Sequence, residues 1–125
     1  MSPQSIQLTI YCLCVAWCRT CDAYVEVFES LKQACPRNVS WVWVDIEDHA
    51  DLLDDVDVEN FPSLLVTSGE YVYFFGPVLP QKAIAAQLIE SVMAGKIDPQ
   101  AVETLQALNQ RFLNSALHGK APQPI

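Results

Sequence analysis

WCRTC, residues Trp17 to Cys21, places two cysteines three positions apart, with two residues between them, directly after an apolar segment near the start of the chain. Cysteines at this spacing occur in redox centres and in metal sites, so the spacing alone leaves both chemistries open. The flanking sequence has to decide between them, because it predicts which secondary structure holds the two thiols.

An alternating segment precedes the pair and an amphipathic segment follows it. Apolar residues at every second position predict a strand within residues 5–15, and its end is apolar on both sides. After the pair, apolar residues recur at helical spacing. This stripe comprises Cys21, Tyr24, Val25, Phe28, Leu31 and Cys35. Pro36 should end the helix, so the pair lies where a strand runs into a helix.

The remaining segments predict an α/β fold. Residues 39–46 form a nearly unbroken apolar strand, residues 47–60 a short acidic helix, and residues 63–67 and 70–75 a hairpin about Ser68-Gly69. Pro80 should open another helix that ends at Gly95. Two parallel crossovers and a terminal hairpin together predict a mixed central sheet with helices on both faces.

An extra C-terminal helix is predicted from Asp98-Pro99, where a capping residue precedes a proline at the first helical position. Its apolar stripe favours packing on the parent domain, and a dimer or partner contact through the 98–116 helix is the alternative. We therefore expect a domain at 1–96, a packed helical extension at 97–116 and a flexible tail at 117–125.

The position of the pair favours redox chemistry. A cysteine in the first turn of a helix meets unpaired backbone N–H groups and the positive end of the helix dipole, which favour the thiolate. Cys18 is therefore the expected nucleophile, and Arg19 adds a nearby positive charge. Cys21 begins the buried stripe, so it is the expected resolving thiol, which attacks a mixed disulfide formed at Cys18.

These residues resemble those of the thioredoxin superfamily over about residues 5–95. The resemblance rests on WCRTC after a core strand, on Phe61-Pro62 before the hairpin, and on Gly69 and Gly76. It implies a thioredoxin-like three-layer fold, with Pro62 as a cis proline beside the pair. It further implies that Phe61 presents its backbone to a substrate strand and that Trp17 covers the nucleophile and contacts partner proteins.

The chain also departs from the family pattern. Arg19-Thr20 replaces the familiar Gly-Pro between the cysteines, and this intervening pair tunes the redox potential in the family. Cys12 and Trp43 stand where thioredoxin keeps a buried carboxylate and a lysine that help the second thiol lose its proton. Another group must then deprotonate Cys21. The candidates by sequence are Asp22, Glu26 and Glu47. The start of the chain is also expected to lack the family's opening strand and helix, and the Asp98 helix to cover the surface that this loss leaves bare.

The expected activity is that of a thiol–disulfide oxidoreductase that exchanges disulfides with protein substrates and receives electrons from an upstream thiol reductant. It needs no cofactor. A non-catalytic thioredoxin-fold binding or assembly module is the alternative. The net charge of −8 disfavours nucleic acid as a partner. Because we find neither an apolar run of ~20 residues nor a signal peptide, we expect no membrane partner and a cytoplasmic location.

A metal site is the competing use of the cysteines, since Cys12, Cys14, Cys18 and Cys21 are four potential sulfur ligands within ten residues. Cys12 and Cys14 share one face of a strand, however, and Cys12 should lie in the core away from the helix tip. We therefore expect no metal. Cys12, Cys14 and Cys35 are interpreted as apolar core residues, and a regulatory disulfide or oxidation at Cys14 is a minor alternative.

Overall fold

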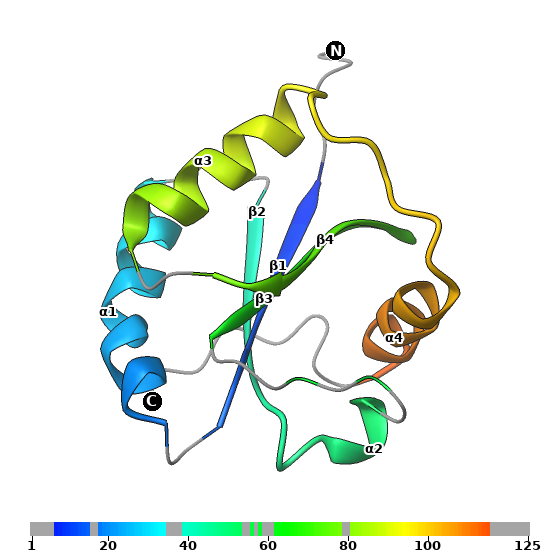
Figure 1. Ribbon diagram of the computed structural model, residues 1–125, viewed down its shortest axis with the longest axis horizontal. Helices are drawn as coiled ribbons and strands as arrows, with labels where there is room; N and C mark the ends of the chain where they lie inside the picture. The colour runs from blue at the N-terminus through cyan, green and yellow to red at the C-terminus, as the bar shows by residue number, and fades with distance from the viewer. Residues whose placement is uncertain are drawn as a thin grey trace.

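The computed structural model describes residues 7–15, 18–34, 39–53, 56, 58, 62–78 and 81–115. The elements in chain order are β1 (Leu8–Cys14), α1 (Arg19–Ala34), β2 (Val39–Asp45), α2 (Ala50–Leu53), β3 (Ser63–Ser68), β4 (Tyr71–Pro77), α3 (Lys82–Met93) and α4 (Glu103–Leu113). Helices α1 and α3 lie on one side of the sheet, and α2 and α4 on the other (Figure 1). The predicted α/β fold with a mixed sheet, two helical layers and an extra C-terminal helix is confirmed.

The sheet has the strand order β2-β1-β3-β4. Strand β1 pairs in parallel with β2 and antiparallel with β3, and β3 pairs antiparallel with β4. The prediction of two parallel crossovers is therefore wrong, because only the β1-α1-β2 connection is one. A parallel connection must carry the chain back along the strands. Helix α2, which follows β2, has only four residues and is too short for this return.

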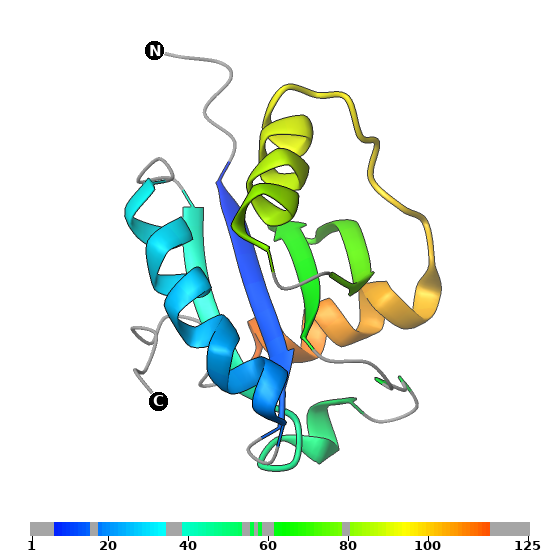
Figure 2. The same ribbon diagram turned by 60° about the vertical axis from the view of Figure 1, so that its left-hand side comes forward.

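Strand β1 forms the centre of the molecule, and all seven of its residues are buried. Its side chains alternate between the two faces, so the apolar residues on both sides meet a separate helical layer. Figure 2 shows β1 between α1 and the helices of the opposite layer. Because β1 lies between strands β2 and β3 and between two helical layers, it fixes where the chain leaves the sheet after Cys14.

We call the side covered by α1 and α3 the cysteine face. Its strand residues include Ile10, Cys12 and Cys14, and its largest buried helical side chains include Tyr24 and Phe28. The ring of Phe28 meets the two tryptophans of β2 edge to face, with centroids 5.2 Å from Trp41 and 5.4 Å from Trp43. The predicted stripe of α1 is thus buried at Cys21, Tyr24, Phe28 and Leu31, while Cys35 lies outside the described residues.

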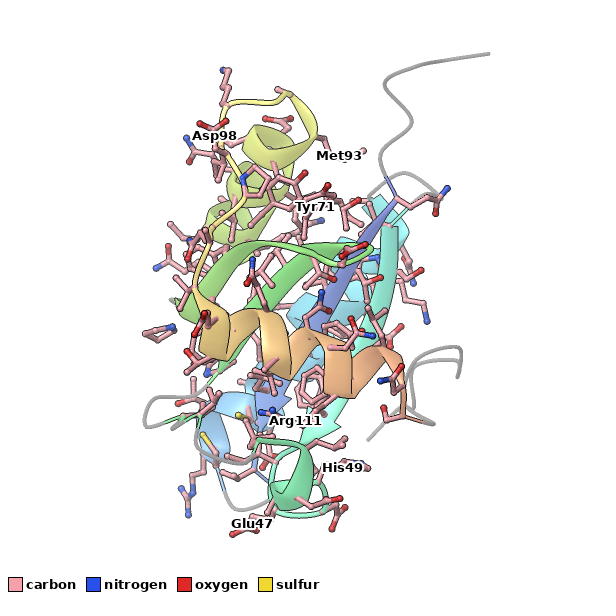
Figure 3. The ribbon with its side chains drawn as sticks, turned by 90° about the vertical axis from the view of Figure 1, so that its right-hand side faces the viewer. Glu47, His49, Tyr71, Met93, Asp98 and Arg111 are labelled. Atoms are coloured by element: carbon pink, nitrogen blue, oxygen red, sulfur yellow. The ribbon has the colours of Figure 1, made fainter. Side chains whose placement is uncertain are left out.

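We call the opposite side, covered by α2 and α4, the Tyr11 face. The ring of Tyr11 lies 4.8 Å from that of Phe112 on α4, and both side chains are fully buried. Arg111 ties the two helices together by donating hydrogen bonds to the backbone oxygens of Leu52 (2.5 Å) and Leu53 (3.2 Å). Figure 3 shows Arg111 on the side of α4 that faces α2.

Helix α4 begins at Glu103, so the predicted start at Asp98-Pro99 is wrong. The preceding segment stays extended because the backbone N–H of Gln100 donates to Val72 O at 2.7 Å and forms an isolated bridge with β4. The acidic segment also differs from the prediction, since its described helix is limited to Ala50–Leu53. Among the described residues, no helix is both long and apolar enough to cross a membrane.

Two predicted turns are confirmed. Gly69 joins β3 to β4 with φ of 58°, and Gly95 follows α3 with φ of 77°. Both angles lie in the left-handed region, which a residue without Cβ adopts at low cost. Beyond Gly95 the chain crosses to the Tyr11 face, as Figure 2 shows, and there α4 packs against the sheet.

Candidate functional site

Cys18 lies at the point where β1 gives way to α1. Its backbone N–H donates to Val15 O at 3.2 Å, and its carbonyl accepts from the N–H of Asp22 at 3.1 Å. The second bond is the first of the helix, so Cys18 occupies the N-cap position, next to the unpaired N–H groups of the first turn. The Cys18 side chain is half-buried, and those of Arg19 and Thr20 are exposed.

Cys21 lies one turn further along α1 and is only 2% exposed. Its thiol lies in the same buried cluster as Cys14, with Cys18 packed against that cluster, and both thiols and the backbone of Val15 act on it electrostatically. Burial, and then the contact with Cys14, raise the pKa of the Cys21 thiol well above its usual value. The two thiols of WCRTC are therefore in contact but differ in environment, because Cys18 reaches the surface and Cys21 does not.

Cys14 extends this contact into the core. Its sulfur lies 3.8 Å from that of Cys12, and the two side chains lie on the same face of β1, as predicted. The hydrogen bond with Cys12 is the largest cause, and burial the second, of a strongly raised pKa of Cys14. The four described cysteines are all free thiols, and they form a continuous series Cys12, Cys14, Cys21, Cys18 from core to surface.

Tyr24 adds a polar group to this otherwise apolar core. Its side chain is fully buried, and its hydroxyl has no hydrogen-bond partner among the residues that the structure describes. Burial, and then the nearby thiols of Cys12 and Cys14, raise the pKa of Tyr24. Sequence reasoning treated Tyr24 only as part of the apolar stripe. Its separation of three residues from Cys21 was the available signal, since residues at i and i+3 share one helix face.

Pro62 lies at the same end of the sheet as the two cysteines. Ser63 pairs with Leu13 in the antiparallel β1–β3 ladder, so the preceding residue, Pro62, lies beside the end of β1 at Cys14. Pro62 is buried, and its carbonyl accepts from the N–H of Val78 at 3.1 Å. The structure therefore brings Cys18, Cys21 and Pro62 to one end of the sheet. The predicted contact residues Trp17 and Phe61 lie outside the described residues.

The carboxylates expected to deprotonate Cys21 lie at the surface, whereas the Cys21 thiol is buried. Asp22, Glu26 and Glu47 are exposed, whereas the groups that shift the pKa of Cys21 are two thiols and one backbone group. Within the described part of the chain, no group of three or more His, Cys, Asp or Glu side chains is arranged to hold a metal ion.

This arrangement suits reversible disulfide chemistry. A partly exposed thiol at a helix N-terminus can attack an external disulfide, and a buried thiol in contact with it can displace the product. The two side chains meet because residues three positions apart lie on one side of the first helical turn, and Cys18 packs against the cluster that contains Cys21. The site thus combines access from solvent at Cys18 with exclusion of solvent at Cys21.

Comparison with known proteins agrees with the fold. The chain resembles a thioredoxin-2 described as a component of malaria parasite protein secretion machinery, with 13% identity, a TM-score of 0.62, and coverage of 69% of this chain and 84% of that one. It also resembles a mutant thioredoxin from Halobacterium salinarum, with 18% identity, a TM-score of 0.60, and coverage of 70% and 76%. A third similar structure is that of chloroplastic thioredoxin z. It has 16% identity and a TM-score of 0.62, and the match covers 71% of this chain and 80% of that one.

At the level of sequence, no curated protein gives a significant match. The family described as Thioredoxin, however, matches residues 4–90, which is more than half of the chain. This match includes the strand before WCRTC, the cysteine pair and the hairpin that begins after Pro62. The chain therefore belongs to the thioredoxin family.

Proposed function

We propose that this chain is a thiol–disulfide oxidoreductase that exchanges disulfides with protein substrates through Cys18 and Cys21. The observation that carries this proposal is the contact between a half-buried thiol at the N-cap of α1 and a buried thiol one turn below it. The family supplies a redox-type fold, and these two thiols supply a nucleophile and a resolving group.

The reaction proceeds in two exchange steps. The Cys18 thiolate attacks one sulfur of the substrate disulfide, which forms a mixed disulfide and releases the other substrate sulfur as a thiolate that takes up a proton. Cys21 then loses its proton and attacks the Cys18 sulfur, which releases the second substrate thiol. The substrate gains two electrons, and the protein is left with a Cys18–Cys21 disulfide.

The cycle closes when an upstream thiol reductant returns two electrons to the Cys18–Cys21 disulfide. Such reductants maintain free thiols in the cytoplasm, so this is the proposed location. The net charge of −8 favours protein substrates that are neutral or basic over acidic ones and over nucleic acid. Pro62 lies beside the pair and is the proposed contact for an extended substrate segment, together with Phe61 and Trp17. Arg19 and Thr20 are proposed to tune the redox potential.

Reduction of insulin by the chemically reduced protein tests this function. We expect wild type to precipitate insulin and Cys18→Ser to lose at least about a hundredfold in rate, because the attacking thiol is absent. Cys12→Ala is the matched control, since it removes a sulfur that lies in the core two residues from Cys14. The control should retain a rate within about threefold of wild type. An inactive wild type, or an active Cys18→Ser variant, would contradict the proposal.

A non-catalytic binding module is the second candidate. The observation in its favour is the raised pKa of Cys21, caused first by burial, which slows the resolving step by keeping this thiol protonated. A binding module would hold its partner without disulfide exchange. Partner binding that survives Cys18→Ser, together with a wild type that cannot reduce insulin, would establish this second function instead.

A further inference from the structure

The proposed reaction uses two of the four described thiols and leaves Cys14 unused. Cys14 is 1% exposed, its sulfur lies 3.8 Å from that of Cys12, and it shares a buried cluster with Cys21, whose thiol is among the groups that act on it. Cys21 in turn contacts Cys18. Cys21 is thus the central sulfur, with one potential disulfide partner at the surface and another in the core.

We propose that Cys14 is a third redox-active thiol, which exchanges with the Cys18–Cys21 disulfide to form a buried Cys14–Cys21 disulfide and leave Cys18 as a free thiol. This inference rests on the proposed function, since it starts from the oxidised form of that cycle. With a Cys14–Cys21 disulfide, the oxidised protein still has a free thiol at Cys18, near its surface.

The exchange balances without an external oxidant. Cys14 gives up its proton, and its thiolate attacks the Cys21 sulfur. The bond between the sulfurs of Cys14 and Cys21 forms while the bond between those of Cys21 and Cys18 breaks, and Cys18 leaves as a thiolate that takes up a proton from solvent. One disulfide and one thiol are present before and after, so no net oxidation occurs.

The direction of attack follows from the surroundings. Cys18 is half-buried at the N-cap of α1, so its sulfur leaves towards solvent, where it can take up a proton. The charged form of Cys14 is disfavoured by Cys12 and by burial. Forming a disulfide removes this ionisable thiol from the core. The Tyr24 hydroxyl is buried in the same cluster as Cys12 and Cys14 and has no hydrogen-bond partner among the described residues.

Cys12 is a poorer partner for Cys14, although their sulfurs are 3.8 Å apart. Residues i and i+2 of a strand have Cα atoms about 6.6 Å apart at a rise of roughly 3.3 Å per residue, which is near the upper limit for a disulfide. Cys14 and Cys21 lie instead on two packed elements that face each other across the core. Cys21 is therefore the favoured partner of Cys14.

The test uses Cys18→Ser, which removes the surface thiol and leaves the buried ones unchanged. The purified variant is equilibrated in glutathione redox buffers, alkylated and digested with trypsin, which cuts after Arg19 and separates Cys21 from Cys12 and Cys14. We expect residues 1–19 and 20–32 to be joined by a disulfide in a major fraction of molecules. Adding Cys14→Ala should reduce this linkage at least about tenfold, whereas adding Cys12→Ala should preserve it.

Wild type gives a second readout that does not depend on the Cys18→Ser variant. Oxidised wild type should contain a fraction with alkylatable Cys18, and this fraction should appear about ten times faster per pH unit between pH 7 and 8.5, as the Cys14 thiolate becomes more abundant. Oxidised Cys14→Ala should contain none.

Three results would overturn the inference: unlinked peptides in Cys18→Ser, a linkage that survives Cys14→Ala, or a disulfide between Cys12 and Cys14 in place of the predicted one. Each can occur while wild type still reduces insulin and Cys18→Ser does not. In that case the proposed function of Cys18 and Cys21 stands and only the role of Cys14 fails. Loss of insulin reduction by wild type would instead contradict the proposed function itself.

Discussion

The two faces of the sheet each bury an apolar core but differ in the side chains that those cores contain. The cysteine face buries thiols, those of Cys14 and Cys21, together with the hydroxyl of Tyr24. The Tyr11 face holds aromatic packing between Tyr11 and Phe112 and the helix contacts made by Arg111. One side of this small sheet therefore carries the thiols of the proposed chemistry, and the other side holds aromatic and helix–helix contacts.

The largest expected effect is on the Tyr11 face. Phe112→Ala removes a fully buried ring and should lower the free energy of unfolding by about 3–5 kcal/mol. Equilibrium unfolding in urea measures this, with Leu113→Ala, a half-buried neighbour, as the control that should lose less. Insulin reduction per folded molecule should remain within about threefold of wild type. A large loss of activity in the folded fraction would show that the two faces do not separate stability from chemistry.

The next effect is on the cysteine face and depends on pH. The reduced folded protein holds the pKa of Cys14 and Cys21 above the value of about 8.5 expected in the unfolded chain. The folded state therefore keeps protons that the unfolded state releases, so stability falls as pH rises above about 8.5, by up to roughly 1.4 kcal/mol per pH unit for each thiol.

Unfolding of the reduced protein at several pH values between 8 and 10 measures this slope. Cys14→Ala should reduce the slope by about half, because one of the two thiols is gone. Burial raises the pKa of Tyr11 to about 12, so the opposite face adds to the loss only above about pH 10. A stability that stays constant from pH 8.5 to 10 would contradict this account of the buried thiols.

A smaller effect is expected from the contact between α4 and α2. Arg111→Leu removes the donors to Leu52 O and Leu53 O and should lower the free energy of unfolding by about 1–3 kcal/mol. Lys82→Leu is the control, because it also removes one positive charge, but from an exposed site at the start of α3. It should change the free energy of unfolding by less than about 0.5 kcal/mol. Equal effects in the two variants would attribute the change to net charge rather than to the helix contact.

The smallest effect, opposite in sign, is expected at Tyr24. Tyr24→Phe removes a buried hydroxyl that has no partner, so the free energy of unfolding should stay unchanged or rise by up to about 1 kcal/mol. Thermal and urea unfolding of the reduced protein measure this. A decrease of more than about 1 kcal/mol would mean that the hydroxyl is hydrogen-bonded in solution.

The sequence predicted the elements whose patterns are local. The stripe of α1, the alternation of β1 and the turn at Gly69 follow from the spacing of apolar residues and from one glycine, and the structure confirms them. The direction of β3 and the start of α4 were predicted wrongly, because both depend on pairing with distant residues. Gln100 shows this well, since its bond to Val72 O overrides the local capping signal of Asp98-Pro99.

The candidate site also combines features set by nearby residues with features set by distant ones. The end of β1, the helix start at Cys18 and the burial of Cys21 were predictable from residues that are close in sequence. The contact of Cys14 with Cys21 and the unpartnered hydroxyl of Tyr24 were not, because they depend on how α1 packs across the sheet. The replacement of the family's buried carboxylate by Cys12 was visible in the sequence, but its effect on Cys14 needed the 3.8 Å separation of their sulfurs.

The position of α4 affects how the chain folds during synthesis. The strands, together with α1 and α3, all leave the ribosome before this helix, so the cysteine face can close while Tyr11 and Leu65 are still without their cover. The nascent domain thus carries an apolar sheet surface until residues 103–113 emerge. During that interval chaperones and neighbouring nascent chains compete with α4 for this surface, whereas the thiols of β1 and α1 are already packed inside.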